Sequence, residues 1–385
     1  MAATRDDRNP FRYGALALDD AFTDRQAEIR ALEADIRNGQ DVVLFAPRRY
    51  GKSSLVWRVA QRLVRRRVLV AQVDLMTTPT KERLAEKLAK TVHEDLATRL
   101  FRARDRALAL FRGLRITPHV TIDPTDGSVS FSFEAGHQRE DVDATLERLL
   151  ELPGELGAGR RRQVAVVFDE FQEVVEIDRA LPQLMRAVFQ TQPKVAHVYL
   201  GSKRHMMERI FNDENEPFWR SAKRIELGLI EPQAFAAYIE NRFAETGKGV
   251  APGIVEGVLA ITGGHPYATQ ELCYFVWEEC PARGTARARH LEAARRRVLQ
   301  AEHAHFSLVW ENASRDQRLL LQALAREPGR PFTAAYRSKY SLPPATNMQK
   351  AVNALRQREL VARDAGGLWR IVEPFLAEWV VENEL

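Results

Sequence analysis

Eight consecutive residues, from Ala46 to Ser53, carry groups that could bind phosphate. They read Ala-Pro-Arg-Arg-Tyr-Gly-Lys-Ser, which follows the pattern G-x-x-x-x-G-K-S/T except at its first position. Backbone N–H groups at the start of a helix attract phosphate oxygens, and Gly51 lets the backbone approach them closely. Lys52 is expected to neutralise the β- and γ-phosphates, and the Ser53 hydroxyl to bind Mg²⁺. The segment predicts a site for a nucleoside triphosphate with magnesium.

Ala46 departs from the pattern because it replaces the first glycine. We expect weaker nucleotide binding if that position needs a positive φ, since an L-residue is strained there. The residues predicted to contact the nucleotide in this loop are Pro47, Arg48, Arg49, Tyr50, Gly51, Lys52, Ser53 and Ser54.

Two carboxylates follow a later apolar run, residues 164–168, which predicts a buried strand. Asp169 is expected to hold magnesium through its water shell, and Glu170 to orient or activate the water that attacks the γ-phosphate. Many buried strands end in acidic residues, so the pair alone is weak evidence for a site. Its position after the phosphate-binding loop in the chain supports the functional interpretation. Ser202 follows a further strand, where it could contact the γ-phosphate or the attacking water, or cap a strand end.

Alternating strands and helices are predicted to position these residues. The expected strands are the apolar runs 42–45, 68–75, 164–168 and 195–200. A helix is expected from Thr23 and Asp24 to Gly39, and another from Ser53 onward. This order predicts an α/β fold in which helices cover both faces of a parallel sheet.

The chain divides into three predicted domains. Residues 1–227 form the α/β domain, with an insertion at about 80–140 that contains amphipathic helices (81–112) and a β-hairpin around Asp126 and Gly127. The hairpin could be an interaction arm or a packed addition. Residues 228–312 are expected to form a helical lid without strands, and residues 313–385 a separate module.

The last module has the pattern of a winged helix. Helices are expected at 314–326, 332–340 and 345–359, followed by a hairpin, and Ser314 and Gln317 have the spacing of a capping box. In the third helix, Met348, Val352 and Leu355 form an inner stripe. The side chains left outside are Asn347, Lys350, Asn353, Arg356 and Arg358. They suit double-stranded DNA, although a protein partner or plain solvation would explain them equally.

Composition narrows the class of protein. The 385 residues are 45% hydrophobic and 28% charged, which is typical of folded globular chains. The 57 basic and 52 acidic residues give a net charge of +5, which indicates nucleic acid only weakly. No apolar run is long enough to span a membrane and the first residues are charged, so we expect a cytoplasmic protein with no membrane partner. Cys273 and Cys280 are expected to be buried thiols.

These motifs together resemble the archaeal-type P-loop ATPases, relatives of the AAA-type and STAND NTPases. The likeness spans almost the whole chain. It rests on Asn9-Pro10-Phe11, Phe22-Thr23-Asp24-Arg25, Arg48 to Leu55, Asp169-Glu170-Phe171-Gln172, Gly201-Ser202 and Gly263-Gly264-His265-Pro266-Tyr267. The resemblance implies that ATP and Mg²⁺ are the ligands, that Phe22 and Arg25 lie by the adenine, and that His265 and Pro266 approach the nucleotide.

One motif departs from the family. Many relatives carry Gly-Arg-Ala where this chain has Arg220-Ser221-Ala222, so the arginine is displaced by one position. Arg220, Arg224 or Arg204 could reach a γ-phosphate, in the same or a neighbouring subunit, and no arginine finger is assigned. Oligomer formation stays open.

Two functions are compatible with the sequence. The first is an ATPase, slow without a partner, that acts as a nucleotide-driven switch and moves the winged helix. The second is a non-catalytic regulator in which ATP occupancy exposes the winged helix to DNA or a protein. Ala46 and the displaced arginine favour the second slightly.

Overall fold

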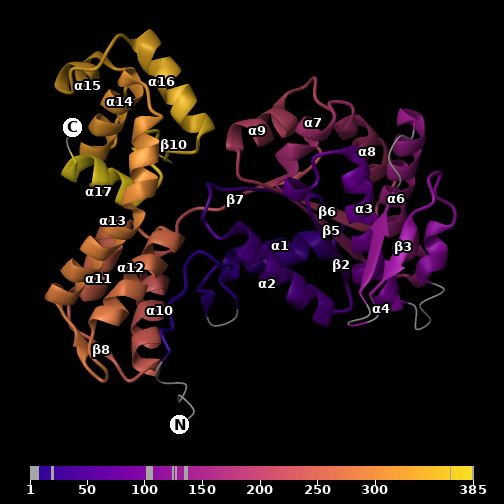
Figure 1. Ribbon diagram of the computed structural model, residues 1–385, viewed down its shortest axis with the longest axis horizontal. Helices are drawn as coiled ribbons and strands as arrows, with labels where there is room; N and C mark the ends of the chain where they lie inside the picture. The colour runs from indigo at the N-terminus through magenta and orange to yellow at the C-terminus, as the bar shows by residue number, and fades with distance from the viewer. Residues whose placement is uncertain are drawn as a thin grey trace. The chain divides into compact units, whose positions relative to one another are not determined.

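The computed structural model describes residues 8–18, 21–100, 107–123, 125, 128–133, 138–364 and 366–383 (Figure 1). The chain forms two compact units. The sheet unit comprises Gln26–Ala46 and Leu55–Leu227. The helical unit comprises the segment up to Arg25, the loop Pro47–Ser54, and Gly228–Leu385. The phosphate-binding loop therefore clusters with the C-terminal half of the chain.

A five-stranded parallel sheet forms the centre of the sheet unit, in the order β2-β5-β6-β1-β7. The strands are β1 (Val42–Phe45), β2 (Leu69–Asp74), β5 (Val164–Asp169), β6 (Val195–Gly201) and β7 (Lys223–Glu226). The first four confirm the predicted strands. Strand β7 was not predicted from the sequence, because it is an edge strand that is polar and largely exposed. Its backbone pairs only with β1.

Helices cover both faces of the sheet, as the α/β prediction requires. Figure 1 shows α1 (Gln26–Arg37) and α2 (Lys52–Arg65) on one side, and α3 (Lys81–Thr91), α6 (Arg139–Arg160) and α8 (Leu181–Phe189) on the other. Alternate strand residues such as Val43 and Phe45 join a core with the second group. Shorter helices α7 (Val174–Ile177) and α9 (Arg204–Asn212) follow β5 and β6.

The insertion contains the expected hairpin, although its predicted turn at Asp126 and Gly127 lies outside the described residues. Strands β3 (His119–Ile122) and β4 (Val129–Ser132) pair antiparallel. Val129 and Phe131 of β4 are buried, and β4 contacts α3. One strand is therefore packed, whereas β3 is exposed along its length.

The helical unit begins with a four-helix region. Its helices are α10 (Pro232–Glu245), α11 (Ile254–Thr262), α12 (Pro266–Glu279) and α13 (Ala288–Glu311). The expectation of a region without strands is wrong, because β8 (Gly249–Val250) pairs with β9 (Thr285–Ala286). These two-residue strands are too short to show a periodic pattern. Cys273 and Cys280 are buried and free, as expected.

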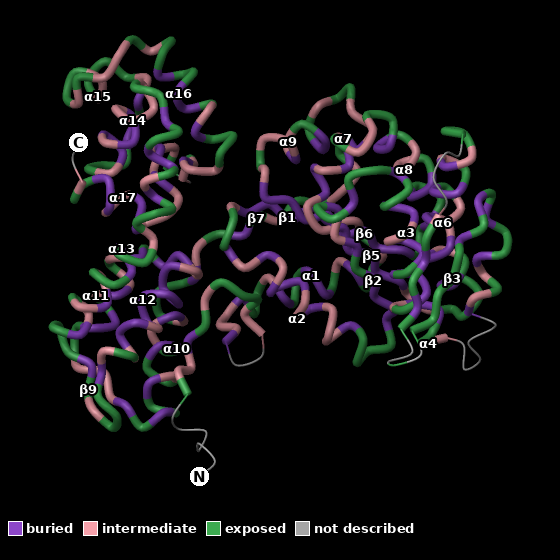
Figure 2. The backbone as a smooth tube through the Cα atoms, viewed as in Figure 1, coloured by how far each residue is buried: buried purple, intermediate pink, exposed green. Residues whose placement is uncertain are grey.

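The winged helix is confirmed. It consists of α14 (Arg315–Arg326), α15 (Ala334–Lys339), α16 (Ala345–Gln357), the antiparallel strands β10 (Val361–Arg363) and β11 (Trp369–Ile371), and α17 (Pro374–Glu382). The capping box of Ser314 and Gln317 starts α14. Figure 2 shows buried and exposed residues interspersed along the helices of this module. The buried residues of α16 include Met348, Val352 and Leu355. In the described part of the chain, no helix is long and apolar enough to cross a membrane.

Candidate nucleotide-binding site

The phosphate-binding loop joins β1 to α2. Its backbone turns through two left-handed residues, Arg49 at φ 64° and Gly51 at φ 84°. Ala46 is not among the described residues of positive φ, so its methyl group causes no backbone strain at the loop entrance. Lys52 is 7% exposed, and its Nζ donates to the Pro47 carbonyl oxygen at 3.1 Å. The lysine is thus folded back across its own loop.

The loop suits a phosphate group. Successive N–H groups in such a turn, at the start of a helix, form a concavity that attracts anions. The first turn of α2 contains no acidic residue that would oppose an anion. A Cβ built on Gly51 would meet no atom within 4 Å, so the space beside its backbone is open. Ser54 serves the fold instead, because its buried Oγ accepts from the Ala17 N–H at 3.0 Å.

The side chains of Arg48 and Arg49 are held by the winged helix. Arg48 Nε lies 3.1 Å from Glu359 Oε2, and Arg49 Nη1 lies 3.5 Å from Glu373 Oε2. The Arg49 guanidinium also lies 4.0 Å from the centre of the Tyr267 ring. Two arginines predicted to meet the nucleotide therefore make contacts within the helical unit that the sequence did not indicate.

Tyr50 lies between the lid and the winged helix. Its ring packs edge-on against His265, with 5.0 Å between centroids, and its hydroxyl accepts from Arg370 Nη2 at 3.5 Å. Only 5% of Tyr50 is exposed, and burial raises the pKa of its hydroxyl. Tyr50 is therefore a neutral packing residue that attaches the loop to His265 and Arg370.

His265 and Pro266 begin α12. His265 Nδ1 accepts from the Ala268 N–H at 3.2 Å, and Pro266 occupies the first turn. Burial, with Arg49 and Arg370 nearby, lowers the pKa of His265 to about 3. The imidazole is thus neutral and acts as a helix cap.

Phe22 and Arg25 belong to the N-terminal segment of the helical unit. Phe22 is half-buried. Arg25 is 4% exposed and donates to the carbonyl oxygens of Gly228 at 2.6 Å and Leu229 at 3.4 Å. Its guanidinium secures the start of the lid segment, a role that its position in the sequence did not indicate.

Within the sheet unit, the structure brings Glu170 and Ser202 together. Asp169 ends β5, and its Oδ1 accepts from the Glu170 N–H at 3.0 Å. Glu170 has a left-handed backbone (φ 52°), and its Oε2 accepts from Ser202 Oγ at 2.7 Å and Ser202 N at 3.3 Å. The neighbouring parallel strands β5 and β6 produce this contact, because their carboxyl ends lie at the same edge.

Gln172, the last residue of the motif Asp169-Glu170-Phe171-Gln172, is a further residue of this cluster to which sequence reasoning gave no role. Its Nε2 donates to Glu170 Oε2 at 2.6 Å, and its side chain is fully buried. A Cβ on Gly201 would lie 2.4 Å from Met207 Cγ and 2.7 Å from Gln172 Oε1, so any larger residue at the end of β6 would have to displace these side chains. The glycine directly before Ser202 was the signal that two side chains approach closely there.

The three candidate arginine fingers are engaged within the sheet unit. Arg204 forms ion pairs with Glu208 and Glu226. Arg220 lies over the Trp219 ring at 5.1 Å, and Arg224 lies 5.9 Å from the centre of the Phe45 ring. These contacts do not identify any of them as a γ-phosphate ligand.

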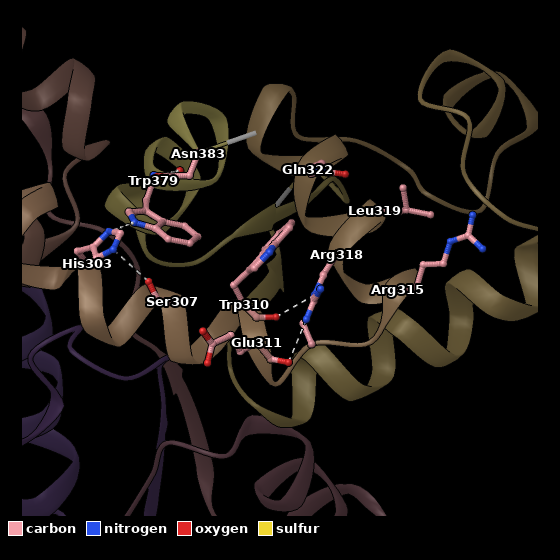
Figure 3. Close-up of a pocket in the computed structure, with 11 residues that line it drawn as sticks. His303, Ser307, Trp310, Glu311, Arg315, Arg318, Leu319, Gln322, Trp379 and Asn383 are labelled. Atoms are coloured by element: carbon pink, nitrogen blue, oxygen red, sulfur yellow. Dashed lines mark hydrogen bonds between the residues drawn. The ribbon is translucent and has the colours of Figure 1, made fainter. Parts of the chain in front are cut away.

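A cavity of about 750 Å³ lies between α13, α14 and α17. Figure 3 shows that Arg318 in its wall donates to the carbonyl oxygens of Trp310 and Glu311, and that Trp379 donates to His303. It contains none of the residues predicted to bind nucleotide. Among the described residues, no group of three or more His, Cys, Asp or Glu could hold a metal ion.

Comparison with known families agrees with this geometry. A family model described as an ATPase domain predominantly from Archaea matches residues 22–272, more than half of the chain. The chain belongs to this family. A second model, a probable winged helix domain, matches residues 304–382 of this chain. No curated protein matches the chain significantly.

Solved structures share the fold of this chain. The Walker-type ATPase PABY2304 of Pyrococcus abyssi superposes with a TM-score of 0.67 at 15% identity, covering 95% of this chain and 97% of that chain. The ORC2 protein of Aeropyrum pernix, in ADPNP-ADP complexes, superposes with a TM-score of 0.56 at 14% identity, covering 93% of each chain. At these identities the likeness concerns the fold alone.

Proposed function

We propose that this ATPase binds ATP with Mg²⁺, hydrolyses it slowly, and uses the nucleotide state to move its winged helix. The observation that carries the proposal is the loop that ends in Gly51, Lys52 and Ser53 at the start of α2, together with a carboxylate, Glu170, held by three donors. The carboxyl ends of β1, β5 and β6 lie at one edge of the sheet, which is where nucleotides bind in such folds.

Each residue has a proposed role. The N–H groups of residues 48–54 and the Lys52 ammonium hold the phosphates, while Ser53 and Asp169 hold the metal, directly and through water respectively. Bound magnesium would neutralise charge on the β- and γ-phosphates. Glu170 orients the attacking water and receives its proton. Ser202 acts through Glu170, because its hydroxyl donates to that carboxylate.

The three-domain division assigns the parts of the proposed switch. Residues 1–227 act as the ATPase domain, residues 228–312 as the lid and residues 313–385 as the moving winged helix. Phe22, Arg25, His265 and Pro266 lie in segments that we propose to flank the nucleotide. Slow turnover follows if no arginine stabilises the transition state, and the engaged contacts of Arg204 support this.

Two substitutions test the proposed activity. Lys52→Ala removes the phosphate-binding charge and should abolish nucleotide binding. Glu170→Gln retains the shape of the side chain but not its basicity, so it should bind ATP and release phosphate at least a hundredfold more slowly. Calorimetry measures binding, and phosphate release measures turnover. Equal turnover by Glu170→Gln and the wild type would refute the role of Glu170.

A second candidate is a non-catalytic, ATP-gated regulator. The ion pairs Arg48–Glu359 and Arg49–Glu373 favour it, because they connect the phosphate-binding loop to the winged helix without involving Glu170. Tight ATP binding with no phosphate release in the wild type would select this candidate.

The winged helix is proposed to contact double-stranded DNA through α16. Lys350 and Arg356 are exposed on this helix, whereas Asn347 donates to Asp316 at 2.9 Å. Duplex binding should fall with salt, and changing Lys350 and Arg356 to Glu should weaken it at least tenfold. Duplex binding that is unchanged by salt and by both substitutions would favour a protein partner instead.

A further inference from the structure

Three carboxylates gather around Arg49 inside the helical unit. They are Glu271 of α12, Glu302 of α13 and Glu373, which precedes α17; together we call them the acidic cluster. Arg49 Nη1 lies 3.5 Å from Glu373 Oε2, and the negative charges of Glu302 and Glu373 act on Glu271. Neighbouring carboxylates repel each other when both are charged, so this arrangement favours the neutral form of Glu271.

The acidic cluster is poorly solvated and has little positive charge to balance it. Glu271 is 1% exposed, and its Oε1, like Oε1 of Glu373, is buried with no hydrogen-bond partner. Burial, together with the charges of Glu302 and Glu373, raises the pKa of Glu271 to about 8, although Arg49 lowers it. Burial and the charge of Glu302 raise the pKa of Glu373 to about 7, again against the lowering effect of Arg49. Arg49 is thus the cation that favours the charged form.

The other groups that face the cluster do not replace Arg49. Tyr267 of α12 and Tyr13 of the N-terminal segment are neutral phenols, because burial and, to a smaller extent, the charge of Glu271 raise the pKa of each. Arg370 of β11 is directed to the Tyr50 hydroxyl. The protonation of the cluster therefore depends mainly on whether the Arg49 guanidinium interacts with these carboxylates or with another anion.

Arg49 is also a residue of the phosphate-binding loop. Its side chain is 40% exposed and its pairing with Glu373 spans 3.5 Å, so solvent screens the pair and a nearby anion can compete for it. A bound nucleotide adds several negative charges beside the loop. These charges either attract the guanidinium away from Glu373 or offset its field where it stands, and both effects favour a proton on the cluster.

We propose that nucleotide binding is coupled to proton uptake by the acidic cluster, with Arg49 as the shared cation. This inference rests on the proposed function, because it needs the loop to bind phosphate. Between about pH 7 and 8 the free protein is partly deprotonated at these sites, and the bound protein less so. Nucleotide affinity accordingly falls as the pH rises through this range, by at most about tenfold per pH unit for each proton taken up. Below about pH 6 this contribution to the pH dependence disappears.

Calorimetry tests the coupling directly. Magnesium-ADPNP is titrated into the full chain at pH 7.5 in two buffers of different ionisation enthalpy, and the difference in heat gives the number of protons taken up. The wild type should take up roughly half a proton to one proton. The double variant Glu271→Gln/Glu373→Gln should take up close to none, after subtraction of any change in the nucleotide itself. The variant Arg49→Gln removes the shared cation without burying a new group, and it should also take up close to no protons on binding.

Glu359→Gln is the matched control. It breaks the neighbouring ion pair between the loop and the winged helix, Arg48–Glu359, which lies outside the acidic cluster. This variant should retain the proton uptake of the wild type. If the wild type, the double variant Glu271→Gln/Glu373→Gln and Arg49→Gln all bind the nucleotide with the same proton uptake, the inference is wrong and the proposed function still stands. Absence of binding heat in every protein, the wild type included, would overturn the proposed function itself.

Discussion

Glu170 occupies a backbone conformation that an L-residue rarely adopts. A left-handed glutamate is less stable than an extended one by roughly 1 kcal/mol or more. The φ of 52° turns the chain directly after β5, so that the carboxylate points back to β6 and meets Ser202 and Gln172. The strain is explained if the position of this carboxylate matters more than local stability.

Ser202→Ala should slow ATP turnover about tenfold and leave nucleotide affinity nearly unchanged. The variant removes one hydrogen bond to Glu170 Oε2, which is worth about 1 to 1.5 kcal/mol if the bond orients the carboxylate in the transition state. Steady-state phosphate release, with calorimetry for affinity, measures the two effects separately.

The same substitution in a Glu170→Gln background provides the control. There the hydroxyl has no carboxylate to orient, so turnover should fall no further. Additive losses in the double variant would show that Ser202 acts on the substrate rather than through Glu170.

At the level of the element, α16 has an exposed polar side, but not all of it is available to a partner. Arg358, directly after the helix, donates to the carbonyl oxygens of Val309 and Asn312 at 3.2 and 3.3 Å. It thus satisfies the last turn of α13, whose terminal carbonyls have no partner within the helix. This residue holds α13 and α16 together.

Arg358→Ala should destabilise the protein by about 1 kcal/mol, because two charge-assisted hydrogen bonds to α13 are lost and solvent replaces them in part. Arg356→Ala, on the same helix and also exposed, should change stability by less than about 0.5 kcal/mol. Urea unfolding followed by tryptophan fluorescence compares them. An equal loss in both variants would contradict the assigned role of Arg358.

The elements of this fold were largely predictable, and the reasons are physical. Apolar runs such as 164–168 are buried on both faces of a sheet, and the capping box at Ser314 marks a helix start, so local sequence decides these structures. The polar strand β7 forms only because β1 supplies its hydrogen bonds. The loop Gly51-Lys52-Ser53 was recognisable from its spacing. The contacts of Arg48 and Arg49 with Glu359 and Glu373 were not, since charge pairing over some three hundred residues leaves no periodic signal.

At the scale of the whole molecule, the acidic cluster joins three helices and so connects the pH to the stability of the helical unit. The pKa of Glu271 rises to about 8 in the folded protein and that of Glu373 to about 7, both above the value of 4.5 for an unfolded chain. The folded state therefore binds more protons than the unfolded state between these values. The resulting stability is fully present below about pH 4.5 and is lost as the pH rises to 7–8.

The free energy of unfolding should accordingly fall by roughly 2 to 4 kcal/mol between pH 5 and pH 8.5, as the coupled carboxylates of the cluster lose their protons. Glu271→Gln replaces the protonated form by a neutral amide, so this variant should show a flatter pH profile. Urea unfolding at both pH values measures the difference. A profile identical to that of the wild type would rule out Glu271 as a source of the pH dependence.

The N-terminal segment completes a core that is otherwise built by Gly228–Leu385. Phe11 is 1% exposed, and its ring centre lies 5.2 Å from that of Phe243 and 6.2 Å from that of Tyr238. During synthesis at about 5 to 20 residues per second, Phe11 leaves the ribosome on the order of ten seconds or more before these partners exist. The lid can therefore reach its final packing only late in translation. A fragment that starts at Gly228 would lack Phe11 and therefore the aromatic ring that packs against Tyr238 and Phe243 in its core.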